Sequence, residues 1–318
     1  MKEKLKRGKC VADSSAGNVA KRNRGFDFLI RLVKEKPLGT VGGIITLLLL
    51  LTGIFADFIA PYGMNETWVG DSLSPPSARF WFGTDNLGRD ILSRVIFGAR
   101  ISVIVGLGAS TLATILSLII GIVSGHIGGK LDLIVQRAVD VVMSIPAIIL
   151  LIALISIIQP GIWQVIVVLG VTWGIIGSRI IRGAVISIKE NAYIEASRAI
   201  GCSTTRILIR HILPNILAPT IILFSTRVPN VILLEASLSF LGFGVPPPYP
   251  SWGSMLSGSG RAYMFQGPWM AIWPGLALSI AVYGVNIFGD AVRDLLDPRL
   301  TGGVGRYGVK VKKAAKEK

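Results

Sequence analysis

Long runs of apolar residues, separated by shorter polar segments, fill most of the chain. Six of these runs reach the length of about 20 apolar residues that a helix needs to cross roughly 30 Å of hydrocarbon. They cover, approximately, residues 40–59, 101–123, 133–158, 163–181, 216–243 and 269–288. The pattern therefore predicts an all-α integral membrane protein with six transmembrane helices.

Composition and charge agree with this prediction and suggest an orientation. Of the 318 residues, 51% are hydrophobic and only 16% are charged. The net charge of +15 is concentrated at the ends, because eleven lysines and arginines precede the first run and five lysines follow Gly308. Basic residues that flank apolar spans favour the cytoplasmic side and anionic lipids. We expect a basic cytoplasmic arm (1–25), a transmembrane domain (26–300) and a basic cytoplasmic tail (301–318) in the plasma or inner membrane.

Two polar segments are predicted to lie outside the hydrocarbon on the outer side. Residues 60–100 are too polar to be accommodated in lipid, where their backbone groups would lack partners. A helix is expected at 90–100, at the end of this outer loop. Residues 245–268 form the second outer loop, with aromatic side chains at the depth of the membrane interface.

A third polar segment, residues 191–214, lies on the inner side and predicts two short helices. Tyr193 to Ile200 is composed of helix formers, and Glu195 and Arg198 are spaced so that they can pair. Gly201 suits the position after a helix C-terminus, and Ser203 or Thr204 can cap a second helix. Pro214 is expected to end that second helix, because proline disfavours helical backbone at the preceding residue. The pair would form a docking knob.

Three charged residues fall within predicted spans, where a charge costs a few kcal/mol. Asp140 is a candidate buried carboxylate near Pro146, which is expected to kink its helix. Arg227 and Glu235 are eight residues apart, about 12 Å along one helix and too far to pair directly. Each therefore needs another partner or a watery cavity.

Several chemistries have no support in the sequence. Gly129-Lys130 lacks the other residues of a phosphate-binding loop, so no ATPase site is expected. His126 has no partners at metal-ligand spacing and is interpreted as a turn residue. Cys10 and Cys202 are expected to be unpaired thiols in the cytoplasm. Nucleic-acid binding is not expected, because the basic segments lack interleaved aromatic residues.

The segment 191–214 resembles the EAA loop of permeases from ABC importers. The residues that carry the resemblance, with their spacing, are Glu195, Ala196, Ser197, Gly201, His211, Leu213 and Pro214. Ser197 stands where the general pattern has alanine, and His211 where it often has isoleucine. The resemblance implies a type I ABC importer permease fold, in which this coupling helix pair docks on a cytoplasmic ATPase subunit.

A second run, from Gly83 to Asp90, resembles the second permease subunit of dipeptide, oligopeptide and nickel importers. It implies a companion permease in a heterodimer, two ATPase subunits that use ATP and magnesium, and an extracytoplasmic substrate-binding protein. No cofactor is expected on this chain. Asp140, Arg227 and Glu235 become candidates for the translocation path, with structural pairing favoured for Arg227. The outer loop could cover the outer gate or touch a binding protein; the alternative is a packed cap that ties the first two spans together.

The sequence thus predicts a permease subunit for di- or oligopeptides that forms half of a pathway. The alternative cargoes are nickel and oligosaccharides, carried by similar machines. A different class, the self-sufficient ion-coupled transporter, would use the few membrane carboxylates as a proton relay. It has little support, because the six runs show no inverted repeat.

Overall fold

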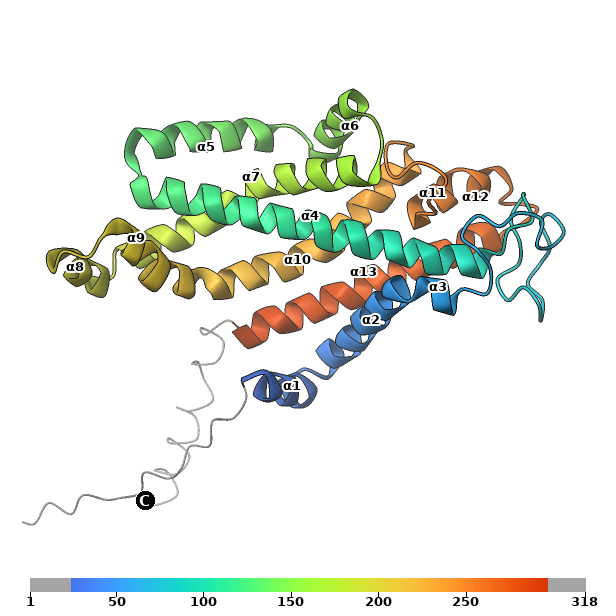
Figure 1. Ribbon diagram of the computed structural model, residues 1–318, viewed down its shortest axis with the longest axis horizontal. Helices are drawn as coiled ribbons and strands as arrows, with labels where there is room; N and C mark the ends of the chain where they lie inside the picture. Colours follow the sequence, from blue (N-terminus) through green and yellow to red (C-terminus); the bar gives the residue numbers. More distant parts are fainter. Residues whose placement is uncertain (1–23, 297–318) are drawn as a thin grey trace, which may run out of the picture.

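The computed structural model describes residues 24–296, which are predominantly helical (Figure 1). Much of the arm, all of the tail and Cys10 lie outside the described residues. The helices are α1 (Arg24–Glu35), α2 (Pro37–Ile54), α3 (Ala56–Ile59), α4 (Ile91–Ile127), α5 (Gly129–Ser144), α6 (Ala147–Ile158), α7 (Ile162–Lys189), α8 (Ala192–Ala199), α9 (Thr204–Ile207), the π-helix η1 (Leu208–Ile212), α10 (Leu213–Phe240), α11 (Trp252–Ser257), α12 (Ser259–Ala262) and α13 (Trp269–Leu296).

Five helical stretches of this part of the chain are long and apolar enough to cross a membrane. They are α2, α4, α7, α13 and the continuous stretch Thr204–Phe240, which joins α9, η1 and α10. The predicted third span is instead the pair α5 and α6, bent by 95°. Counted as one broken span, this pair brings the total to the predicted six.

The bend between α5 and α6 follows from the expected effect of Pro146. The preceding residue, Ile145, has φ −95° and ψ 130°, the extended backbone that a following proline favours. Figure 1 shows α5 beside α4 and α6 turned across the bundle. The kink was predicted. Its angle is large enough that the expected span consists of two separate helices, α5 and α6.

The centre of the bundle is the pair α4 and α7, its most extensive helix contact. Glycines allow the two backbones to approach. A Cβ at Gly170 or Gly174 of α7 would overlap Leu112 or Leu116 of α4. These glycines therefore allow the close packing of α4 and α7. α10 packs on α4 and α13, and α2 packs on α13.

Several helices extend beyond the predicted spans. The expected helix at 90–100 and the second span form one helix, α4, of 37 residues. Asp90 caps it by accepting hydrogen bonds from the Ser93 amide at 2.8 Å and hydroxyl at 2.7 Å. α13 runs two turns past the predicted residue 288. Hydropathy marks where apolar residues stop, whereas a helix continues until a cap or break.

The bundle has two distinct ends (Figure 1). We call the end with α8 and α9 the inner end, and the end with residues 60–90 the outer end, following the orientation that the sequence predicts. α1 lies at the start of α2, where Leu32 packs against Ala291 and Leu295 of α13.

Candidate functional site

The segment 191–214 forms a helical hairpin at the inner end. α8 ends at Ala199, and Gly201 follows with a φ of 80°, the left-handed backbone expected after a helix. The Ser203 hydroxyl then caps α9, accepting a hydrogen bond from the Arg206 amide at 3.4 Å. The two predicted short helices and their glycine hinge are both present.

Pro214 does not end the second helix, so that prediction is wrong. η1 bridges α9 and α10, with the Leu213 amide bonded to the carbonyl of Leu208. This π-type turn shifts the register just where Pro214 enters as an early residue of α10. Early helix positions need no amide donor, so the missing N–H of proline is tolerated. The inner hairpin is consequently continuous with a membrane span.

Apolar residues anchor the hairpin to the rest of the protein. Ile194 and Ile212 are fully buried, and Ile207 is nearly so. They pack in one cluster with Ile181 and Val185 of α7. The hairpin is therefore seated on the inner half of α7.

The opposite side of the hairpin is open. Glu195, Ala196 and Gly201 are exposed, while Ile200 is 81% and Ile209 is 62% exposed. Ile200 is thus exposed beside the turn at Gly201, and Ile209 is an exposed apolar residue of η1. Sequence reasoning missed them, because buried isoleucines of the same segment have similar neighbours.

The remaining motif residues stabilise the hairpin. The Ser197 side chain is buried and donates a hydrogen bond to the carbonyl of Tyr193 at 2.7 Å. Partly buried His211 lies with its ring 6.3 Å from that of Tyr193. Leu213 joins the apolar cluster, and Pro214 is exposed.

The suggested pairing of Glu195 with Arg198 does not occur among the ion pairs of residues 24–296. Glu195 and Arg198 both lie on exposed parts of α8.

Asp140 is not the buried carboxylate that was expected. Its side chain is 42% exposed and pairs with Arg179 of α7, while Arg137 lies 3.7 Å away. The bend at Pro146 explains the difference, because it leaves α5 on the outside of the bundle. Asp140 therefore contacts α7 on one side, and the rest of its side chain is exposed.

Glu235 and Arg227 of α10 are both deeply buried, at 0% and 4% exposure. Glu235 accepts a hydrogen bond from the Ser239 hydroxyl at 2.7 Å. Its second carboxylate oxygen is buried without a partner among the described residues. Arg227 donates to the Ser117 hydroxyl and to the carbonyl of Trp173. The two residues do not pair, as expected.

A further ion pair holds the inner half of α5. Arg182 of α7 donates two hydrogen bonds to Asp132, from Nε to Oδ1 at 2.6 Å and from Nη2 to Oδ2 at 2.5 Å. Ser124 of α4 also contacts the same carboxylate. Sequence reasoning did not single out Asp132, because a charge near a helix start is ordinary there.

The outer loop is a packed structure. Asp85 accepts hydrogen bonds from the amides of Leu87 and Arg89 and from the Arg89 side chain. Trp269 of α13 donates to the carbonyl of Thr84 at 3.1 Å. These contacts favour the packed-cap interpretation of residues 83–90.

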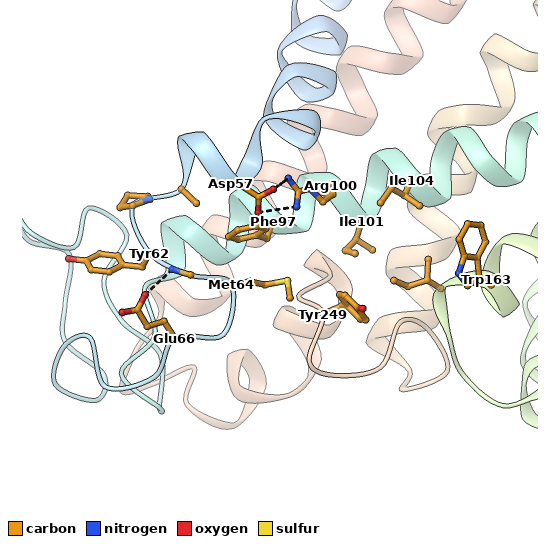
Figure 2. A pocket seen from close by; sticks show the side chains of 14 residues that line it. Asp57, Tyr62, Met64, Glu66, Phe97, Arg100, Ile101, Ile104, Trp163 and Tyr249 are labelled. Atoms are coloured by element: carbon orange, nitrogen blue, oxygen red, sulfur yellow. Dashed lines mark hydrogen bonds and ion pairs between the residues drawn. The ribbon is translucent and has the colours of Figure 1, made fainter.

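A cavity of about 660 Å³ lies at the outer end, between the loop and helices α4 and α7 (Figure 2). Arg100 and Asp57 pair within it at 2.7 Å. Tyr62, Trp163 and Tyr249 supply aromatic rings from three separate segments. Because its ion pair is internally satisfied, the cavity offers mainly apolar and aromatic contacts.

Comparison with known families identifies the chain. The model described as "Binding-protein-dependent transport system inner membrane component" matches residues 117–302. The model for the "N-terminal TM domain of oligopeptide transport permease C" matches residues 27–76. The chain belongs to the binding-protein-dependent transport permeases.

Curated relatives of this permease match most of its length. The oligopeptide permease protein OppC of Bacillus subtilis (strain 168) is 38% identical over 274 residues, which is 86% of this chain and 89% of the relative. The dipeptide permease protein DppC of Alkalihalophilus pseudofirmus is 38% identical over 268 residues, 84% and 88% of the two chains. The probable D,D-dipeptide permease protein DdpC of Escherichia coli (strain K12) is 34% identical, covering 86% and 92%.

A solved structure shares the fold of this permease. An inward-facing MetNI methionine ABC transporter chain aligns with a TM-score of 0.54 at 21% identity, covering 65% of this chain and 98% of that one. At this identity the likeness concerns the fold alone, and it agrees with the predicted type I ABC importer architecture.

Family membership defines the role of this permease. Members are membrane subunits of ABC importers, in which separate ATPase subunits hydrolyse ATP and a binding protein delivers the substrate. The chain is therefore a transport subunit without its own ATPase site. Membership also decides against the self-sufficient ion-coupled transporter.

Proposed function

We propose that this permease forms half of the translocation pathway of a di- or oligopeptide importer. Support comes from the names of its relatives, which describe oligopeptide and dipeptide transport. The permease would pair with a homologous but distinct subunit, because the run 83–90 resembles one of two permease types. Nickel and oligosaccharides remain the alternative cargoes.

We further propose that the segment 191–214 couples the permease to a cytoplasmic ATPase subunit. The observation that carries this proposal is the exposed turn at Gly201, with exposed Ile200 beside it and exposed Ile209 on η1 of the same hairpin. Two exposed isoleucines beside charged residues suit a groove that buries an apolar anchor inside a polar rim. Glu195, Ala196 and Ser197 belong to the helix that would sit there.

The free energy that drives transport would come from two ATPase subunits that bind ATP and magnesium. Their closure would displace the hairpin, and continuity of α9, η1 and α10 would carry the displacement into the membrane. Alternating access follows if the spans then move as rigid bodies. This arrangement requires both ends of the chain, like the hairpin, to lie in the cytoplasm.

Asp140 and Glu235 stay candidates for the translocation path. Asp140 is accessible at the edge of α5. Glu235 is enclosed, so it would reach a path only after a movement of α10 or of the loop near Ser251. Its buried, unpartnered oxygen is the feature that supports such a role.

The coupling proposal is tested with Gly201→Asp and Glu195→Ala in the complete transporter reconstituted in proteoliposomes. We expect both variants to insert and assemble, and both to uncouple ATP hydrolysis from uptake, so that hydrolysis continues while uptake is lost. At a φ of 80° an aspartate strains the hinge and places a charge at the docking tip.

The matched control is Gly242→Asp at the outer end. Gly242 has a φ of 87° and, like Gly201, open space around it. This variant should transport nearly normally. Full uptake by Gly201→Asp would refute the coupling role.

Cargo is tested through the substrate-binding protein that works with this permease. Dipeptides, oligopeptides, nickel and oligosaccharides are added separately, and the shift in melting temperature of that protein is measured. Peptides should give the largest shift, since ligand binding stabilises the native state. A shift with nickel or oligosaccharide alone would overturn the peptide assignment.

A further inference from the structure

Arg227 occupies an unusual position for a charged residue in this permease. It lies near the middle of α10 and is 4% exposed. Its side chain points between α4 and α7, the two helices that form the centre of the bundle. The described ion pairs of residues 24–296 give it no acidic partner.

The guanidinium joins three helices through one nitrogen. Nη2 donates to the Ser117 hydroxyl of α4 at 3.0 Å and to the carbonyl of Trp173 on α7 at 2.9 Å. The Ser117 hydroxyl in turn donates to the carbonyl of Gly174 at 2.9 Å. A continuous set of hydrogen bonds therefore runs from α10 to α4 and α7.

Gly177 makes this contact possible. A Cβ at this position would overlap Arg227 Nη2 and lie 2.6 Å from both its Cζ and the Ser117 hydroxyl. The absence of a side chain opens the backbone of α7 to the guanidinium. Gly177 thus makes room for one specific side chain, that of Arg227.

Charge neutralisation does not explain Arg227. The acceptors are neutral, and Nη1 is buried without a partner in the described part of the chain. Apolar residues of similar volume commonly stabilise a core as well as buried charges do. What arginine adds is a planar set of donors that fixes the relative position of its neighbours.

Arg227 also lies on the helix that leaves the coupling segment. Thr204–Phe240 is one helical stretch, and Arg227 is about 21 Å along it from Leu213. A displacement of the inner hairpin is thus carried to Arg227 without an intervening loop.

We propose that Arg227 is a positioning residue that locks α10 to α4 and α7, so that movement of the coupling segment displaces the three helices together. The inference rests on the coupling role proposed for residues 191–214. It assigns to Arg227 and Gly177 a joint function in the efficiency of coupling.

The test compares Arg227→Met and Gly177→Ala with the native permease in the assembled transporter. Methionine keeps an unbranched apolar side chain but lacks the guanidinium group, so it removes the hydrogen bonds and vacates the space of Nη2. The alanine methyl occupies the place of Nη2. We expect uptake per ATP hydrolysed to fall about tenfold in each, a common size for coupling between distant sites.

Two further variants make the test specific. Gly183 lies on the same helix with open space around it, so Gly183→Ala should keep the native ratio of uptake to ATP hydrolysis. In Gly177→Ala/Arg227→Met the methyl fills vacated space, so the double variant should be no worse than Arg227→Met alone. An additive loss in the double variant would contradict the proposed contact.

A purely structural role predicts a different result. Arg227→Met would then lower the melting temperature of the complex while the ratio of uptake to ATP hydrolysis stayed native, and this outcome overturns the proposal. If Arg227→Met does not assemble, Ser117→Ala decides in its place, since it removes one acceptor only. A native ratio of uptake to ATP hydrolysis in Ser117→Ala would equally overturn the proposal.

Gly201→Asp, measured in parallel, separates this proposal from the one on which it rests. If Gly201→Asp uncouples but Arg227→Met does not, the lock alone is refuted. If Gly201→Asp transports fully, the coupling role itself fails.

Discussion

Asp85 shows how one side chain organises the outer loop. Its side chain is 5% exposed, and Arg89 Nε lies 2.6 Å and Arg94 Nε 3.9 Å from its Oδ2. Its Oδ1 accepts from the amides of Leu87 at 2.8 Å and Arg89 at 3.0 Å. A buried carboxylate with this many donors stabilises the turn that carries it.

We therefore expect Asp85→Asn to loosen residues 83–90. Loss of a buried charge that pairs with arginine costs about 3 kcal/mol. Hydrogen exchange of the Leu87 and Arg89 amides should become faster, because local opening is then easier. Asp71→Asn is the control, since Asp71 is exposed in the same loop. Unchanged exchange in Asp85→Asn would show that the carboxylate does not hold the turn.

At the scale of elements, α5 is held to the bundle largely by charge. Val139 is the buried residue of this helix, so apolar packing contributes little within the described chain. Asp132 with Arg182 and Asp140 with Arg179 supply two cross-links to α7. Beyond Pro146 the chain turns, and α6 packs through Leu151 and Ile155.

Asp132→Asn should release the inner half of α5. Charged hydrogen bonds of this kind contribute about 2 kcal/mol. Their loss should broaden the distribution of distances between spin labels on α5 and α7. Arg137→Gln is the control, because Arg137 is 76% exposed and 3.7 Å from Asp140. Exposed pairs of this kind contribute little. A narrow distance distribution in Asp132→Asn would contradict the role of the ion pair.

The elements also show where sequence reasoning succeeds and fails. The lengths of the apolar runs predicted the spans, with α5 and α6 counted as one. Gly201 and Ser203 predicted the turn between α8 and α9. Proline was ambiguous: Pro146 breaks a helix, whereas Pro214 enters one behind a π-type turn. Backbone register decides between these outcomes, and register depends on packing that a local sequence does not contain.

The candidate site was predicted in part for the same reason. The motif from Glu195 to Pro214 located the hairpin. It did not distinguish exposed Ile200 from buried Ile194, because both are apolar residues of short helices. The partners of Arg227 come from α4 and α7, far away in sequence, so only the fold brings them together.

At the scale of the whole molecule, the bundle is longer than the hydrocarbon is thick. The 37 residues of α4 span about 55 Å, against roughly 30 Å of hydrocarbon. We therefore expect both ends to project into water, with the hairpin and the outer loop in opposite compartments.

Cysteine labelling tests this orientation. In a background with Cys10 and Cys202 replaced by serine, Ile200→Cys and Trp81→Cys are treated with a membrane-impermeant maleimide in intact cells. Both positions are exposed, at 81% and 70%. Trp81→Cys should react from outside, and Ile200→Cys only after the cells are opened. Reaction of Ile200→Cys in intact cells would place the hairpin outside and remove the basis for coupling.

The unbroken helical stretch Thr204–Phe240 fixes both the distance and the angle between the hairpin and Arg227. Each residue added to an α-helix advances it by about 1.5 Å and rotates it by about 100°. A single residue inserted between the hairpin and Arg227 would turn the hairpin in a new direction relative to Arg227 without changing the identity of any existing residue. If the hairpin couples to the ATPase as proposed, we therefore expect such an insertion to impair transport as much as a substitution within the hairpin does.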